Sequence, residues 1–239
     1  MKNVMLTTVI IASVILTACN KGGGSFTDSR VKKISSTRGG TEYTYTADNK
    51  IQAVKNADGS KTTYTYKDKS ITQLRADSLH GMNITSNIFL NGAGYADSSI
   101  ATDQSGSYVE IYLHDANGYI TESKDMISGK LYNATISTFK DGNEVEREIT
   151  DSSSKPRVKL FFDYYTDKSN SVGYENMGMK FLGNDSKNLM KKFVQVLPTG
   201  DTIRTMNFTY HFDDKGRVSQ KVVYDNHGML ADSSTVTYY

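Results

Sequence analysis

One short unit recurs along this 239-residue chain and constrains its fold more than any other feature. The unit consists of two aromatic residues one position apart, then an Asp-rich turn, then a β-branched residue. Tyr45 and Tyr66, which hold the same place in two copies, are 21 residues apart. A repeat of roughly 20 to 50 residues is typical of stacked supersecondary units, here two strands and two turns each. The copies occupy residues 43–51, 64–71, 112–120, 139–145 and 208–218.

Turn residues and alternating side chains both indicate β-hairpins. Asp-Gly or a longer Asp-to-Gly stretch separates apolar runs at 58–59 and 225–228. Glycine at these turns accepts the positive φ that tight hairpins require. Val109, Ile111 and Leu113 alternate with polar and tyrosine residues. Because successive side chains of a strand point to opposite faces, this spacing predicts one inward face.

These patterns predict an all-β domain. We expect an antiparallel meander of repeated hairpins, with about nine to twelve strands, that forms a curved open sheet or half-barrel. Irregular segments are expected at 19–30, 77–107 and 170–190, and the last of these is expected to cover one end of the sheet. A single helical turn is expected over Ser186–Lys192, with a polar N-cap at its start.

The N-terminus has the features of an export signal. A charged start, an apolar run over 4–16 and small residues before Cys19 define a secretory leader. The run is shorter than the roughly 20 residues that a transmembrane helix needs. A cysteine directly after the leader resembles the lipobox of bacterial lipoproteins, which implies a lipid on Cys19. We expect a signal peptide at 1–18, a flexible tether at 19–30 and the β-repeat domain at 31–239, with the chain lipid-anchored at the outer membrane, on its periplasmic or surface face.

Two families resemble the part of the chain that follows the leader. The aromatic, Asp and Gly units are similar to the YD repeats of RHS-type proteins, which form long β-hairpin arrays. Four further stretches are Phe181-Leu182-Gly183, Ser186-Lys187-Asn188-Leu189, Phe208-Thr209-Tyr210 and Asp213 with Gly216-Arg217-Val218. On these stretches the chain resembles Bacteroidota lipoproteins of unknown function with a porin-like β fold. That resemblance implies an all-β fold and an envelope location, and it implies no activity.

Residue types that carry catalysis or metal binding are sparse or wrongly spaced. The single cysteine excludes a Cys-based zinc site, and the histidines have no zinc-binding spacing. No catalytic residue, metal site or cofactor is therefore predicted, although calcium at the Asp-rich turns stays open. A net charge of +2 without a basic stripe argues against a nucleic-acid partner. The histidines are His80, His114, His211 and His227.

Two sets of side chains are candidates for surface roles. Glu144, Glu146 and Glu148 alternate by two, so they should share one face, which we expect to be exposed. Five tyrosines could form a ligand-stacking face for a glycan or an envelope protein, or they could be the core of the curved sheet. They are Tyr43, Tyr45, Tyr64, Tyr66 and Tyr112.

The expected function follows from three features: the lipid anchor on Cys19, the repeated hairpins and a sequence in which no set of catalytic residues is recognised. We expect a membrane-anchored lipoprotein that acts as a non-enzymatic binding or structural module of the cell envelope. One alternative is an integral outer-membrane β-barrel, although many alternate strand positions are Thr, Ser, Lys or Asp rather than apolar. A second alternative is a cell-envelope hydrolase that uses paired carboxylates.

Overall fold

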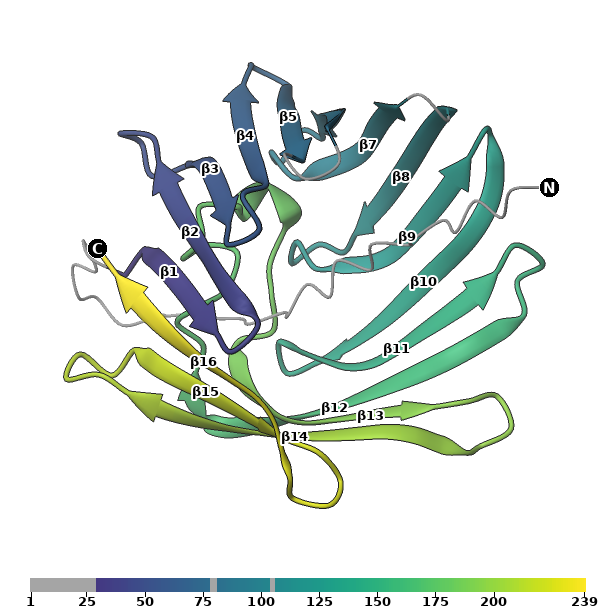
Figure 1. The fold of residues 1–239 in the computed structure, drawn as a ribbon. Coiled ribbons are helices and arrows are strands. Elements are labelled where there is room, and N and C mark those ends of the chain that lie inside the picture. The colour runs from purple at the N-terminus through teal and green to yellow at the C-terminus, as the bar shows by residue number, and fades with distance from the viewer. Residues whose placement is uncertain (1–28, 78–80, 104–105) are drawn as a thin grey trace.

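A computed structural model describes residues 29–77, 81–103 and 106–239. Within these ranges the chain forms one closed barrel of sixteen antiparallel strands, drawn in Figure 1. Each strand pairs with its neighbours in the sequence, so the barrel is an up-and-down meander. The expectations of an all-β fold and of a meander are confirmed. The expected signal peptide and Cys19 lie outside the described residues.

The bounds of the elements show how regular the meander is. The strands are β1 (Val31–Ser36), β2 (Gly39–Tyr45), β3 (Ile51–Asn56), β4 (Lys61–Tyr66), β5 (Ser70–Asp77), β6 (Met82–Leu90), β7 (Ala96–Asp103), β8 (Gly106–His114), β9 (Ile120–Ile127), β10 (Lys130–Lys140), β11 (Asn143–Asp151), β12 (Pro156–Ser169), β13 (Asn188–Val196), β14 (Thr202–Phe212), β15 (Val218–Tyr224) and β16 (Leu230–Tyr238), with a 3₁₀ turn η1 at Lys180–Leu182.

The expected open sheet or half-barrel is wrong, because the first and last strands pair. Ile34 lies opposite Val236, and Ser36 lies opposite Ser234. This pairing leaves neither β1 nor β16 as a free sheet edge. Alternation along a segment predicts a strand but not its distant partner, so local patterns could not show that the two ends of the meander meet.

Two local expectations are also corrected. The stretch 77–107 contains β6 and β7 rather than a long loop. These strands are rich in Ser, Thr and Asn, which weakens the hydrophobic signal that identifies a strand. Ser186–Lys192 forms no helical turn, because β13 begins at Asn188. The one short 3₁₀ turn of the described residues lies earlier, at Lys180–Leu182. None of the helical segments described is long and apolar enough to cross a membrane.

The Asp-rich turns explain the sequence repeat. Oδ1 of Asp115 accepts hydrogen bonds from the backbone N–H groups of Asn117 and Tyr119, at 2.9 Å each. Gly118 follows with a φ of 81°, a value that L side chains rarely adopt. Asp213 and Asp225 cap their own turns through the same pair of backbone contacts. The aspartates therefore fix the turns by local hydrogen bonds.

One end of the barrel is crossed by residues 170–187, the connection between β12 and β13, which lies within the ring of strands in Figure 1. This stretch, called the end segment below, was expected from the sequence to cover one end of the sheet. It bonds to strand ends and turns on several sides of the barrel. Its backbone hydrogen bonds join Asn176 to Val31, Gly178 to Ile51, Asn184 to Gly118 and Lys187 to Gly142.

The hydrophobic core lies where the end segment meets the inner wall. Val172 and Phe181 of the end segment pack into a buried cluster with strand residues. Burying apolar surface in this way stabilises the fold by about 25 cal/mol per Å². The strand members of the cluster are Val31, Tyr43, Ile51, Ile71, Ile88, Ala96, Leu189, Tyr210, Val218 and Val236.

Candidate functional site

A buried ion pair lies within β11, close to the end segment. Arg147 on β11 donates two hydrogen bonds to the carboxylate of Glu144, from Nε at 2.8 Å and from Nη2 at 2.7 Å. The Glu144 side chain is 4% exposed, so the charge is largely removed from water. A paired, bidentate geometry is what makes such burial tolerable.

The end segment adds a carboxyl group to the same buried region. Oδ2 of Asp185 accepts a hydrogen bond of 2.6 Å from the backbone N–H of Tyr174. Burial, with a smaller contribution from the nearby Glu144 carboxylate, raises the pKa of Asp185 to about 8. Ser186 donates to the hydroxyl of Tyr164 at 3.0 Å and accepts from the backbone N–H of Glu144 at 2.7 Å. Ser186 therefore joins the end segment to the wall, whereas the Asp185 carboxyl bonds within the end segment.

Glu144 corrects the prediction of three exposed glutamates on one face. The register between β10 and β11 shifts between Thr138 and Phe139. This bulge turns Glu144 inward. Glu146 and Glu148 stay outside, where both contact Lys159 at 2.9 and 2.8 Å. Simple alternation over the stretch fails because a bulge adds one residue to the count.

The five predicted stacking tyrosines lie inside the barrel. Tyr43 is 9% exposed and belongs to the buried cluster, and Tyr64 packs on Phe181 of the end segment with ring centroids 6.2 Å apart. The hydroxyl of Tyr66 donates to the carbonyl of Ile51 at 2.9 Å. Tyr45 donates to the carbonyls of Val31 and Asn176, and Tyr112 donates to the Glu110 carboxylate. Their role in ligand stacking stays a prediction.

Away from the end segment, the inward side chains of β8 to β10 are polar. Glu110 and Asp125 lie directly opposite each other on adjacent strands. The Glu110 carboxylate accepts a hydrogen bond from Ser99 at 3.0 Å, and Asp125 accepts one from Asn133. Sequence reasoning missed this pair, although the alternation of Tyr108, Glu110 and Tyr112 was the available signal. Side chains can fill the interior of an eight-stranded barrel. A barrel of sixteen strands encloses a wider space, so polar side chains on its inner wall can face that space.

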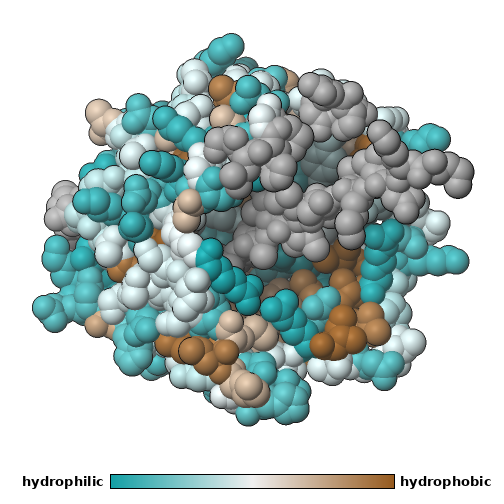
Figure 2. Space-filling model, in the orientation of Figure 1, coloured by the Kyte–Doolittle hydropathy of each residue, from teal (hydrophilic) through white to brown (hydrophobic). Residues whose placement is uncertain are grey.

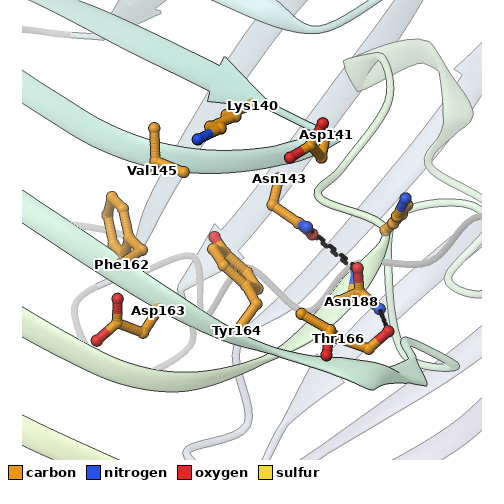
Figure 3. A pocket seen from close by; sticks show the side chains of 10 residues that line it. Lys140, Asp141, Asn143, Val145, Phe162, Asp163, Tyr164, Thr166 and Asn188 are labelled. Atoms are coloured by element: carbon orange, nitrogen blue, oxygen red, sulfur yellow. Dashed lines mark hydrogen bonds between the residues drawn. The ribbon is translucent and has the colours of Figure 1, made fainter.

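A pocket opens in the wall at the end-segment side of the barrel (Figure 3). Its volume is about 290 Å³, and it lies between the start of β11 and the second half of β12. Its lining includes Val145, Phe162, Asp163, Tyr164 and Thr166. Sequence reasoning missed this site because residues distant in the chain form it.

The histidine and acidic side chains of the described residues form no metal centre. His114 stacks on Tyr95 with ring centroids 5.2 Å apart. Across the described ranges, no group of three or more His, Cys, Asp or Glu side chains is placed to hold a metal ion. His80 and Cys19 lie outside the described residues, and the lipid on Cys19 stays a prediction.

Comparison with known proteins gives a fold. No protein-family profile matches the chain, and no curated protein matches it. A porin-like protein from Bacteroides uniformis ATCC 8492 matches with a TM-score of 0.62 and 16% identity, over 89% of this chain and 97% of that one. A porin-like protein from Bacteroides vulgatus ATCC 8482 matches with a TM-score of 0.60 and 15% identity, over 88% and 98%.

These neighbours define the class as a porin-like β-barrel. At this level of identity the likeness establishes the fold alone. The expected Bacteroidota porin-like fold is therefore confirmed, whereas the similarity to YD repeats stays a prediction. The closed barrel and its neighbours fit the alternative of an outer-membrane barrel better than the expected lipoprotein binding module.

Proposed function

We propose that this protein is an outer-membrane β-barrel protein whose barrel is closed at one end by its own chain, a cup for small polar solutes rather than a through channel. The observation that carries the proposal is the course of the end segment. It bonds to β1, to β3, and to the β8–β9 and β10–β11 turns, so it bridges the mouth from several sides. A porin of sixteen strands leaves an aqueous channel, and this segment lies across it.

The outer wall supports contact with lipid over part of its circumference. Exposed apolar side chains include Phe89, Ile111 and Leu113 on β6 and β8. Elsewhere the outside carries exposed ion pairs, such as Lys33 with Glu42 at 3.0 Å. Figure 2 shows brown hydrophobic areas confined to patches of the visible face. Because a Lys at the bilayer midplane costs about 2–4 kcal/mol, the polar sectors are unsuited to lipid.

A lipid on Cys19 would supply the remaining attachment. Cys19 precedes Val31, the first residue of β1, by twelve positions, and an extended chain of that length reaches about 40 Å. The backbone N–H of Val31 donates to the end segment at Asn176, so β1 begins at the closed end. The proposal therefore places the lipid within about 40 Å of the closed end of the barrel.

Cell fractionation tests the attachment. The wild-type chain should sediment with outer membranes. A Cys19→Ala chain, exported by the signal peptide of a non-lipidated periplasmic protein, should be released only in part by a carbonate wash, because part of its outer wall is apolar and still contacts lipid. If this variant resists the wash as fully as the wild type, the wall alone holds the barrel, and the lipid part of the proposal fails.

Conductance in planar bilayers tests the closed end. The N–H of Asn170 donates to the carbonyl of Lys187 at 3.3 Å, so the two ends of the end segment lie side by side. Residues 172–185 can therefore be replaced by Gly-Ser-Gly without stretching the wall. The wild type should give no steady ion current, whereas the replaced variant should conduct. Steady current through the wild type contradicts the proposal, as does a replaced variant that retains its strand content but does not conduct.

A further inference from the structure

The wall pocket exists because two neighbouring strands separate. β11 and β12 are paired from Glu146 opposite Phe161 to Thr150 opposite Pro156. Beyond Glu146, toward the turn, β11 bonds instead to the last residues of the end segment. The N–H of Glu144 donates to Oγ of Ser186 at 2.7 Å, and in the adjoining turn the carbonyl of Gly142 accepts from the N–H of Lys187 at 2.7 Å. The second half of β12 is thereby left apart from β11, and the pocket occupies the space between them (Figure 3).

The floor of the pocket is fixed before any ligand arrives. Asn143 and Asn188 are 8% and 5% exposed and bond to each other twice. Nδ2 of Asn143 donates to Oδ1 of Asn188 at 3.1 Å, and the Asn188 N–H donates to Oδ1 of Asn143 at 3.0 Å. Nδ2 of Asn188 also donates to the carbonyl of Thr166 at 3.3 Å. A ligand would therefore meet a preformed surface, which reduces the entropy that binding costs.

The lining combines balanced charge with an apolar patch. Lys140 and Lys187 contribute two positive charges, and Asp141 and Asp163 contribute two negative charges. All four residues are exposed at the rim. Figure 3 shows the ring of Tyr164 pointing into the space between the strands, with Phe162 and Val145 beside it. A ligand here would find donors, acceptors and a ring surface together.

We infer that this wall pocket binds one neutral sugar unit of a glycan. Balanced charge gives neither an anion nor a cation a net attraction, whereas sugar hydroxyls can accept from the lysines and donate to the aspartates. The C–H face of a sugar ring can rest on the apolar patch of Val145, Phe162 and Tyr164. About 290 Å³ is at the lower end of small-molecule sites, which suits a single ring with its chain extending outward. The inference is independent of the cup, because the site lies in the wall.

Saturation-transfer NMR on the full mature chain tests the inference. The probes are glucose, galactose, mannose and N-acetylglucosamine, with galacturonate as the anion and alanine as the zwitterion. At least one neutral sugar should show transfer. Asp163→Ala should weaken its binding at least tenfold, and Val145→Trp, which fills the pocket, should abolish it.

Asp167→Ala is the matched control, because Asp167 is an exposed aspartate of the same strand that does not line the pocket. It should leave sugar binding within twofold of the wild type. Circular dichroism of each variant should show unchanged strand content. The inference is overturned if no neutral sugar binds the folded wild type, if galacturonate or alanine binds more tightly than every neutral sugar, or if Asp163→Ala and Asp167→Ala behave alike.

Discussion

Replacing Arg147 by Met should destabilise the barrel strongly, because it would leave the Glu144 carboxylate buried without its partner. Glu144 is 4% exposed, and both carboxylate oxygens receive hydrogen bonds from the guanidinium. Breaking a buried pair by removing one member costs about 3–5 kcal/mol, which is a hundredfold or more in the unfolding equilibrium constant. The guanidinium also lies 5.6 Å from the centre of the Phe162 ring, so packing is lost with the charge.

Urea unfolding followed by far-UV circular dichroism measures the effect. The double variant Glu144→Met/Arg147→Met should recover much of the loss, since an apolar pair can replace a buried ion pair at little cost. Lys159→Met is the matched control, because it removes an exposed partner of Glu146 and Glu148 and should leave the midpoint unchanged. The reasoning is refuted if Arg147→Met unfolds at the same urea concentration as Lys159→Met. It is also refuted if the double variant loses as much stability as Glu144→Met and Arg147→Met lose together.

Two further predictions concern the end segment. Asp185 has a pKa raised to about 8 in the folded protein against 3.8 as reference, so the folded state holds the extra proton between these values. The free energy of unfolding should therefore fall as the pH rises from about 4 to 8. Urea midpoints measured across this range should fall less steeply in Asp185→Asn than in the wild type. The same dependence of the midpoint on pH in both proteins would contradict the burial of this carboxyl. Gly178 has a φ of +67°, and a Cβ there would lie 2.6 Å from the Ile51 nitrogen. The matched control is Gly216, which has a φ of +74° and no atom within 4 Å of the added Cβ, so that Gly216→Ala should cost only about 1–2 kcal/mol. Gly178→Ala should lower the thermal midpoint clearly more than Gly216→Ala. Equal shifts of the two midpoints would show that the end segment does not pack as described.

Much of the local structure could be predicted from the sequence, because turns and alternation are local properties. The Asp-Gly units predicted hairpins, and Asp115 shows why, since it bonds to the backbone of its own turn. The irregular stretch before β13 was predicted as well. Ser, Thr and Asn residues on β6 and β7 concealed two strands, since their side chains are not apolar.

The rest depends on contacts between distant residues. The pairing of Ile34 with Val236 joins the two ends of the domain, and no local pattern predicts it. Glu144 is buried because of a register shift beside Phe139, which alternation cannot show. The wall pocket forms where the start of β11 bonds to Ser186 of the end segment and no longer pairs with β12. These contacts decide whether the strands form an open sheet or a closed barrel. The proposed function depends on the closed barrel, so local sequence patterns could not predict it.

Cross-linking across the seam between β1 and β16 tests the closed barrel most directly. In a Cys19→Ala background, Ser35→Cys and Thr235→Cys place thiols on residues that lie directly opposite each other. Opposed residues of antiparallel strands have Cα atoms about 4.5–5.5 Å apart, within reach of a disulfide. Mild oxidation should form this disulfide rapidly within one chain, and Ser35→Cys with Ser233→Cys, two positions out of register, should form it far more slowly. An open sheet, with β1 and β16 apart, would leave both pairs reduced.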